Sequence, residues 1–470
     1  MPPVIIQGGM GAGVSNWVLA RAVSRRGHLG VVSGTAMDAI LLRTLADGDP
    51  GGHYRRALEA FPIPKIAEDI LDRFFKAGGR ADGEPYPNLP LHRRVMKPWQ
   101  DHLIVLANFA EVFLAKEGHD GDVGINLLTK IQIPNLPSLY GAMLAGVTYV
   151  LMGAGIPKEI PGALDLMALH EPATVRLEMQ SGTGADDEVL TFDPMKMWGD
   201  AIPIDLTRPA FLPIVASNSL ATMLARKSTG RIDGFIIEGP TAGGHNAPPR
   251  GGGEINERGE PVYGDRDVVD LAKIAEIGLP FWLAGGVGSP EGLQVARAAG
   301  AAGIQVGTLF AFTEESGVLT DLKHDVVSQV RNGGVDVLTD GRASPTGFPF
   351  KAVELAGTIS QPGVYESRTR VCDLGYLRSV YRREDGRLDY RCASEPVGTF
   401  VKKGGDIAET VGRKCLCNAL LANIGLGQVR EDGARELPLL TSGDELKNLG
   451  RFLGDRDTYS ADDVLDFLLS

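Results

Sequence analysis

A histidine that directly follows a glycine-rich turn is the residue of this chain best placed to do chemistry. Residues 234–245 read GFIIEGPTAGGH, an apolar run typical of a buried strand and then a turn that delivers His245. An imidazole has an ordinary pKa of about 6.5, so it can take a proton from an acidic substrate near neutral pH. The alternative is a structural loop histidine bonded to the backbone.

Two further strand-and-glycine units predict a place for a phosphate. FWLAGGVG carries Gly285 and Gly286, and GIQVGTLF carries Gly307 and Thr308. Buried strands that each end in glycines are typical of a parallel α/β barrel, whose βα loops converge at one face and bind phosphate through backbone N–H groups. We therefore expect a phosphate-bearing cofactor beside His245, and glycines that only close the barrel are the alternative.

The N-terminal loop, QGGMGAG, invites comparison with the dinucleotide-binding fingerprint. Counted from Gly9 and Gly11, Val14 stands where the third glycine belongs, and the second expected strand has no acidic residue for a ribose at its end. We interpret the glycines as clearing side chains so that backbone can approach something flat. A plain tight turn is the alternative.

Apolar strands that alternate with capped helices predict an α/β fold, a (β/α)8 TIM-type barrel. Ser15, Ser217 and Ser289 are placed to cap helices. Residues 173–180 and 188–192, joined by the turn-rich SGTGADD, indicate a hairpin outside the barrel. The eight expected barrel strands are residues 4–7, 29–33, 123–127, 148–152, 211–215, 234–238, 281–284 and 303–306.

Two segments fall outside this repeat. One is an insertion after the second strand, expected to contain a helix near residues 66–75 and to pack over one end of the barrel. The other is a C-terminal extension with a helix near residues 417–424 and a last helix capped by Ser460. The predicted domains are the barrel (1–36 and 103–360), the insertion (37–102) and a C-terminal subdomain (361–470).

Composition and charge are those of an ordinary globular protein. Of 470 residues, 43% are hydrophobic and 23% charged, and a net charge of −12 without long Lys or Arg runs argues against nucleic-acid binding. The uncharged stretch 131–157 is interrupted by prolines and polar residues, so we expect a buried helix and then a strand, with no membrane partner. The start of the chain lacks a signal-peptide pattern, which predicts a cytoplasmic protein.

The four cysteines cluster late in the chain, at Cys372, Cys392, Cys415 and Cys417. Such a cluster suggests a thiolate site for zinc or iron–sulfur. Cys-x-Cys is shorter than the usual ligand spacing, however, and the other two cysteines stand singly. Reduced structural cysteines are therefore the alternative, and the metal remains unknown at this point.

Five motifs, taken in chain order, resemble the nitronate monooxygenase family, once called 2-nitropropane dioxygenases. They are QGGMGAGVS, GINLL, EGPTAGGH, LAGGVGSPEG and IQVGTLF. The family is itself similar to flavin-dependent enoyl reductases of fatty-acid, polyketide and polyunsaturated-lipid synthesis. The resemblance covers residues 3–36 and 104–315.

The resemblance implies an FMN-binding barrel in which His245 matches the family's catalytic histidine. It implies a flavin ring lined by one group of residues and a phosphate held by another. The ring group is Gln7, Gly8, Gly9, Met10, Asn126, Gly243 and Gly244, and the phosphate group is Gly285, Gly286, Gly307 and Thr308.

The function expected from this resemblance is oxidation of nitronates or nitroalkanes by O2, with His245 as the base acting on a small-molecule substrate. One alternative is an FMN enoyl-thioester reductase that uses NAD(P)H as electron donor, and another is a non-redox phosphate-binding barrel or accessory protein. The chain has Glu238 and Ala247 where the family usually has Gln and Gly. These departures leave the identity of the substrate open. A homodimer is possible from the sequence. Arg250 is either an anion-binding residue or a solvated loop residue.

Overall fold

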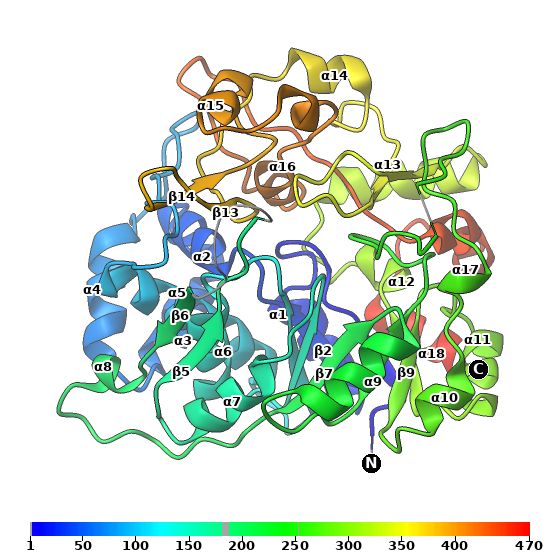
Figure 1. Ribbon diagram of the computed structural model, residues 1–470, viewed down its shortest axis with the longest axis horizontal. Coiled ribbons are helices and arrows are strands. Elements are labelled where there is room, and N and C mark those ends of the chain that lie inside the picture. The colour runs from blue at the N-terminus through cyan, green and yellow to red at the C-terminus, as the bar shows by residue number, and fades with distance from the viewer. Residues whose placement is uncertain (1, 181–187, 252) are drawn as a thin grey trace.

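The computed structural model describes residues 2–180, 188–251 and 253–470, so the predicted SGTGADD turn lies outside the described residues. Its centre is a closed barrel of eight parallel strands (Figure 1), which confirms the predicted fold. Around the barrel the strands follow one another in chain order: β1 (Ile5–Gln7), β2 (Leu29–Ser33), β3 (Val123–Leu128), β4 (Tyr149–Gly153), β7 (Ala210–Val215), β8 (Phe235–Glu238), β9 (Phe281–Ala284) and β10 (Gly303–Val306).

The barrel strands are buried on both faces, which is why they appear in the sequence as short continuous apolar runs. Alternate residues point into the barrel. There Ile6, Leu151, Leu212, Ile236 and Trp282 pack into a separate apolar cluster. The residue two positions after each of these therefore lies at the carboxyl end of the barrel interior.

Helices follow the barrel strands on the outside. Ser217 and Ser289 cap α9 and α11 as predicted. Within the uncharged stretch 131–157, α6 is buried and β4 follows it, as expected, and no helix of the described chain is long and apolar enough to cross a membrane. These helices are α1 (Trp17–Arg25), α5 (Pro98–Lys116), α6 (Asn135–Leu144), α7 (Ile160–Ala168), α9 (Asn218–Lys227), α10 (Leu271–Ala275), α11 (Pro290–Ala298), α12 (Thr308–Ala311) and α13 (Thr320–Arg331).

The prediction that Ser15 caps α1 is wrong. Asn16 is the cap, and its side chain accepts a hydrogen bond from the backbone N–H of Leu19 at 2.9 Å. The hydroxyl of Ser15 instead donates to the Gly8 carbonyl at 3.0 Å and accepts from the Met10 N–H at 2.9 Å. The hydroxyl therefore bonds to the preceding loop and holds that loop in place.

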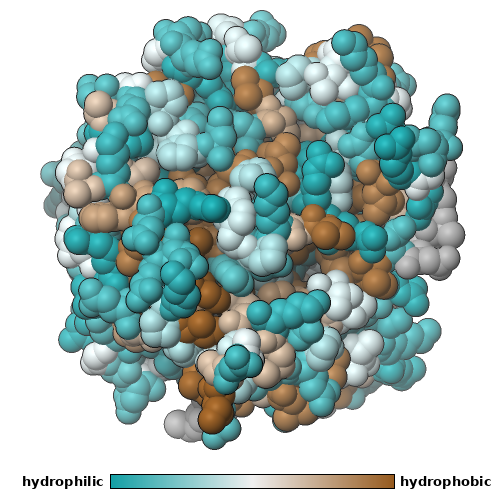
Figure 2. All heavy atoms as spheres, turned by 90° about the vertical axis from the view of Figure 1, so that its left-hand side faces the viewer, coloured by the Kyte–Doolittle hydropathy of each residue, from teal (hydrophilic) through white to brown (hydrophobic). Residues whose placement is uncertain are grey.

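The segment 37–102 flanks the barrel. Its helices α2 (Met37–Ala46), α3 (His53–Glu59) and α4 (Pro64–Phe74) pack on α5, and α4 is the helix predicted near residues 66–75. Hydrophilic and hydrophobic side chains are interspersed on the face of the molecule that includes these helices (Figure 2).

Several short elements lie outside the barrel sheet. The antiparallel pair β5 (Ala173–Arg176) and β6 (Val189–Phe192) lies outside it, as predicted, and precedes α8 (Met195–Trp198). A second antiparallel pair, β11 (Val337–Asp340) and β12 (Phe350–Val353), was not predicted.

The C-terminal region lies over the carboxyl end of the barrel and then returns to its side (Figure 1). The helix predicted near residues 417–424 is α16, and Ser460 caps the last helix as predicted. That last helix packs against α1, α11 and α12. The elements are α14 (Pro362–Ser367), β13 (Ser379–Arg382), β14 (Leu388–Arg391), α15 (Val397–Lys402), α16 (Leu416–Ala422), α17 (Leu449–Leu453) and α18 (Ala461–Leu468), and the short 3₁₀ turns are η1 (Pro50–Gly52), η2 (Asp265–Asp267), η3 (Ile407–Thr410) and η4 (Asp444–Asn448).

Candidate active site

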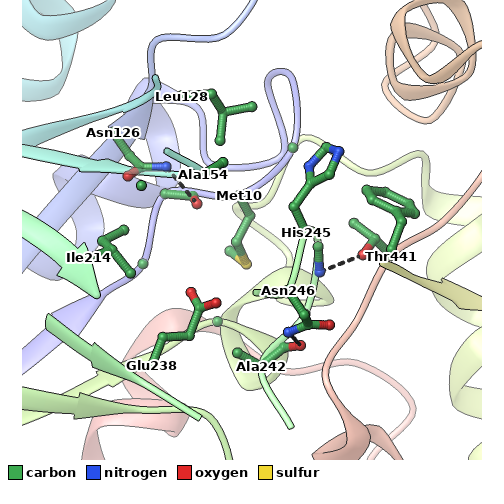
Figure 3. Close-up of a pocket in the computed structure, with 18 of the residues that line it drawn as sticks. Met10, Asn126, Leu128, Ala154, Ile214, Glu238, Ala242, His245, Asn246 and Thr441 are labelled. Carbon is green, nitrogen blue, oxygen red and sulfur yellow. Dashed lines mark hydrogen bonds between the residues drawn. The ribbon is translucent and has the colours of Figure 1, made fainter. Parts of the chain in front are cut away.

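A cavity of about 440 Å³ lies at the carboxyl end of the barrel, and its floor is the last inward-pointing layer of the strands. Figure 3 shows Asn126, Ile214 and Glu238 at strand ends around this space, with Met10 between them and His245. A cavity of this size suits a small-molecule ligand. The floor residues are Gly8, Asn126, Gly153, Ile214, Glu238, Ala284 and Gln305.

The cavity walls come from loops that are far apart in the sequence. The loops after β1 and β8 form two of them, and the C-terminal region forms a third, whereas residues 37–102 contribute none. The C-terminal wall consists of Tyr376, Leu377, Leu416, Cys417, Leu420, Asn423, Leu440, Thr441, Ser442, Gly443 and Glu445.

Most of the predicted site residues meet in this cavity. Gln7 and Gly286 do not line it. Gln7 is fully buried, and its side-chain Nε2 donates to Ser15 Oγ at 2.8 Å, while its side-chain Oε1 accepts from the Val31 N–H at 3.1 Å. The expectation that Gln7 lines the ring is therefore not met, and Gln7 fixes the loop instead. The predicted residues that line the cavity are Gly8, Gly9, Met10, Asn126, Gly243, Gly244, His245, Gly285, Gly307 and Thr308.

His245 is held by the unpredicted strand β12. The backbone N–H of Lys351 donates to the Gly244 carbonyl at 2.9 Å, so the loop after β8 forms a short antiparallel bridge with β12. The ring of Phe350 lies 5.0 Å from the imidazole in an edge-on arrangement, and Nε2 is 2.7 Å from Ser344 Oγ. Burial lowers the pKa of His245 to about 4, so the imidazole is uncharged near neutral pH.

Glu238 is a second ionisable group in the cavity, and sequence reasoning did not include it in the site. It stands at the end of β8 on the cavity floor. Burial raises the pKa of its carboxyl group to about 8, because no nearby positive charge stabilises the carboxylate. The side chain is therefore a neutral carboxylic acid at neutral pH.

Several buried acceptor atoms around the cavity have no hydrogen-bond partner within the described chain. Asn126 Oδ1 and Gln305 Oε1 belong to the floor, and Asn246 Oδ1 and Asn423 Oδ1 to the walls. Buried polar atoms without partners are costly. These atoms are covered by the protein, so they lie beside the cavity without opening into it.

The predicted phosphate-binding loops are in contact with the C-terminal region, which sequence reasoning did not foresee. The Gly443 N–H donates to Thr308 Oγ1 at 3.1 Å, and the Asp444 N–H donates to the Thr241 carbonyl at 3.0 Å. The Gly244 N–H donates to Thr441 Oγ1 at 2.9 Å. The small polar run T-S-G at residues 441–443 is the signal that could have pointed to this contact.

Arg250 lines the cavity, and the hydrogen bonds of its guanidinium go to backbone carbonyl groups. Its guanidinium donates to the carbonyl groups of Ala216 and Arg266, and its own N–H donates to Asp267. The protein itself therefore holds the guanidinium in place.

The four cysteines do not form a recognisable metal site. Across residues 2–180, 188–251 and 253–470, no group of three or more His, Cys, Asp or Glu side chains is arranged to hold a metal ion. Cys392 Sγ lies 3.2 Å from Ser394 Oγ, and Asn418 Nδ2 donates to Cys415 Sγ at 3.5 Å. These bonds favour the interpretation as structural thiols.

Part of the chain is similar to known proteins. Residues 205–336 match the family model described as nitronate monooxygenase. A protein of Staphylococcus saprophyticus subsp. saprophyticus named "Probable nitronate monooxygenase" is 32% identical over 114 residues, which are 24% of this chain and 30% of that protein. The chain therefore aligns with under a third of this relative's length.

The fold of the whole chain has a counterpart among solved structures. The structure of FabK from Thermotoga maritima aligns with 100% of this chain and 92% of its own, at 17% identity and a TM-score of 0.50. At this level of identity the likeness concerns the fold alone.

Proposed function

We propose that this protein is an FMN-dependent oxidoreductase that oxidises nitronates or nitroalkanes with O2, and the match of residues 205–336 to the nitronate monooxygenase family model supports this. The observation that supports this most is the position of His245. An uncharged imidazole borders the cavity that is lined by most of the predicted flavin-binding residues.

The residues around the cavity fit a flavin. Backbone without side chains approaches the cavity at Gly8 and Gly9, and a Cβ on Gly9 would lie only 2.3 Å from the Cβ of Asn126. Bound FMN would take up electrons from the substrate and pass them to O2. The residues that would hold it are Gly8, Gly9, Met10, Asn126, Gly243, Gly244, Gly285, Gly307 and Thr308.

His245 supplies the base. When Nε2–H donates to Ser344 Oγ, the lone pair of Nδ1, which has no partner among the described residues, accepts the proton on the carbon next to the nitro group. Loss of that proton gives the nitronate. The contact with Ser344 and the edge of Phe350 fix the ring, so the base is oriented before the substrate arrives.

The second candidate is an NAD(P)H-dependent enoyl-thioester reductase, and Glu238 is the observation in its favour. Reduction of an enoyl group needs an acid that protonates one of the two carbons. His245, with its lowered pKa, is a poor acid, whereas Glu238 is a neutral carboxylic acid in the same cavity.

The test is a visible absorption spectrum of the purified protein, with the released cofactor identified by mass. Anaerobic mixing with either a nitronate or NADPH follows, and flavin bleaching is recorded. We expect stoichiometric FMN that is bleached by the nitronate. Bleaching by NADPH and reoxidation by an enoyl thioester would support the second candidate. A colourless protein that cannot be reconstituted with FMN would overturn both and leave a non-redox barrel.

A further inference from the structure

The polar side chains of the cavity floor come from three different strands. Asn126 stands on β3, Glu238 on β8 and Gln305 on β10, and their floor neighbours are small or apolar residues such as Ile214 and Ala284. Because the floor is the inward-facing end of a rigid barrel, these side chains are held at fixed positions around the base of the cavity.

The floor is rich in acceptors. Asn126 donates its amide nitrogen to the Gly9 carbonyl at 3.4 Å, and Asn126 Oδ1 and Gln305 Oε1 are buried acceptors without a partner in the described chain. The carboxyl group of Glu238 makes no hydrogen bond or ion pair with any described residue. As a carboxylate it would only add to the acceptors, with no cation beside it.

The other charged and titratable groups around Glu238 have hydrogen-bond partners of their own. Tyr263 donates to the Ala247 carbonyl at 3.0 Å, and Glu445 accepts from the Gly288 N–H at 2.7 Å. His245 is uncharged and bonded to Ser344, and the guanidinium of Arg250 is bonded to backbone carbonyls. The flanking strands β7 and β9 contribute only apolar side chains to the floor beside Glu238.

We propose that Glu238 keeps its proton in the cavity and donates a hydrogen bond through it to an acceptor atom of the bound ligand. Burial of the carboxyl group, which raises its pKa to about 8, supports this. The acceptor is either a ring atom of the flavin or an oxygen of the substrate, so the inference rests on the proposed function for the identity of the ligand. Binding therefore weakens as the pH rises past 8 and the donor becomes a repelling carboxylate.

Two substitutions distinguish the effect of the Glu238 proton on binding from the effect of the size of the side chain. Glu238→Gln keeps a donor in the same place and cannot ionise, and it restores the residue usual in the resembling family. Glu238→Leu removes the donor at similar size. Glu445→Gln is the matched control, because it changes the other carboxyl group of the cavity, whose oxygen already accepts a backbone N–H.

The experiment measures the Kd of FMN for the apoprotein by fluorescence, and the Kd of a nitroalkane for the FMN-loaded protein, across a pH series on both sides of 8. For the wild-type protein and Glu445→Gln, we expect one of these Kd values to rise about tenfold per pH unit above 8. Glu238→Gln should lose this rise and keep the tight binding. Glu238→Leu should bind about fivefold more weakly than Glu238→Gln at every pH.

The outcomes show whether the acceptor belongs to the flavin or to the substrate, and they test this inference separately from the proposed function. A rise in the Kd of FMN places the acceptor on the flavin, and a rise confined to the nitroalkane places it on the substrate. The same pH profile in the wild-type protein and Glu238→Gln, for both ligands, would overturn this inference while leaving the flavin assignment intact. Loss of the rise in Glu445→Gln would also overturn it. Failure of every protein to bind FMN would instead overturn the proposed function.

Discussion

At His245 the surroundings fix the protonation state. The edge of Phe350 and the buried hydroxyl of Ser344 leave no anion to stabilise an imidazolium, and the pKa falls to about 4. A base with this pKa is weak, yet it is fully deprotonated in the range where nitroalkanes are still largely neutral. Position therefore matters more than basicity for the proposed proton transfer.

The first prediction concerns this residue. The imidazole stays neutral until the pH falls close to 4, so the acidic limb of kcat/KM for a nitroalkane should lie between about 4 and 5 and not near the ordinary value of about 6.5. His245→Gln should slow flavin reduction by a neutral nitroalkane about 10²- to 10⁴-fold. Anaerobic stopped-flow absorbance over a pH series measures both.

A preformed nitronate is the control for the same variant, because it has already lost the proton that the base removes. Its oxidation should suffer much less in His245→Gln. An acidic limb near 6.5 would contradict the assigned protonation state, and equal losses for nitroalkane and nitronate would contradict the role as base.

At the scale of elements, the segment 441–443 ties the C-terminal region to the loops after β8 and β10. The Cβ of an alanine at Gly443 would lie 2.8 Å from the Thr241 carbonyl oxygen and 3.0 Å from Thr308 Oγ1. The φ of Gly443 is −77°, which any residue adopts, so a clash is the only expected penalty. The close approach therefore depends on the missing side chain.

The second prediction follows from this contact. Gly443→Ala should push residues 441–443 away from Thr308, lower the free energy of unfolding by about 1–3 kcal/mol and weaken FMN binding. The control is Gly398→Ala in α15, where an added Cβ meets no atom within 4 Å. That variant should be neutral or slightly stabilising, since alanine favours a helix. Urea unfolding and FMN titration measure both, and equal behaviour of the two variants would contradict the prediction.

The elements differ in how well the sequence predicted them, and the reason is physical. All eight barrel strands were predicted, because a strand buried on both faces must be apolar along its whole length. The β11–β12 pair was not, although Phe350 and Ser344 shape the surroundings of His245. Its role depends on a contact across about 100 residues of chain, which no local pattern encodes.

Site residues were likewise predicted where a local sequence pattern marks them and missed where the contact is between distant parts of the chain. Glycines and His245 at strand ends were predicted, since the carboxyl ends of barrel strands converge. Gln7 and Ser15 were misjudged, because their side chains bond to each other within the loop, a local pairing that competes with the predicted roles. The C-terminal wall was missed altogether, because the chain beyond the barrel carries no barrel periodicity.

At the scale of the whole molecule, the C-terminal region both closes the cavity and braces the barrel. Lys351, on β12, donates to Asp444 at 2.8 Å, and Arg26, just after α1, donates to Asp462 and Asp466 of α18 at 3.0 and 2.6 Å. We therefore propose that the barrel (1–36 and 103–360), the segment 37–102 and the C-terminal region (361–470) unfold together. Cavity groups then contribute to the stability of the entire chain.

The last prediction uses this coupling. In the unfolded chain a glutamate has a pKa of about 4.3, whereas burial holds that of Glu238 at about 8. Between these values the folded protein binds a proton that the unfolded chain does not, so Glu238 lowers the free energy of unfolding progressively as the pH rises through this window. Above about 8 both states are ionised and the loss is complete.

In Glu238→Gln this dependence is absent. The free energy of unfolding of the variant minus that of the wild-type apoprotein should therefore rise between pH 5 and pH 8 and then level off. The opposite contribution of His245, whose lowered pKa makes stability rise with pH between about 4 and 6.5, is present in both proteins and cancels. Urea unfolding at a series of pH values gives the difference directly. The exposed control Glu431→Gln shows how much of the difference comes from the loss of a negative charge alone. A difference between Glu238→Gln and the wild type that does not change with pH would contradict the prediction, because the carboxyl group would then ionise as freely in the folded protein as in water.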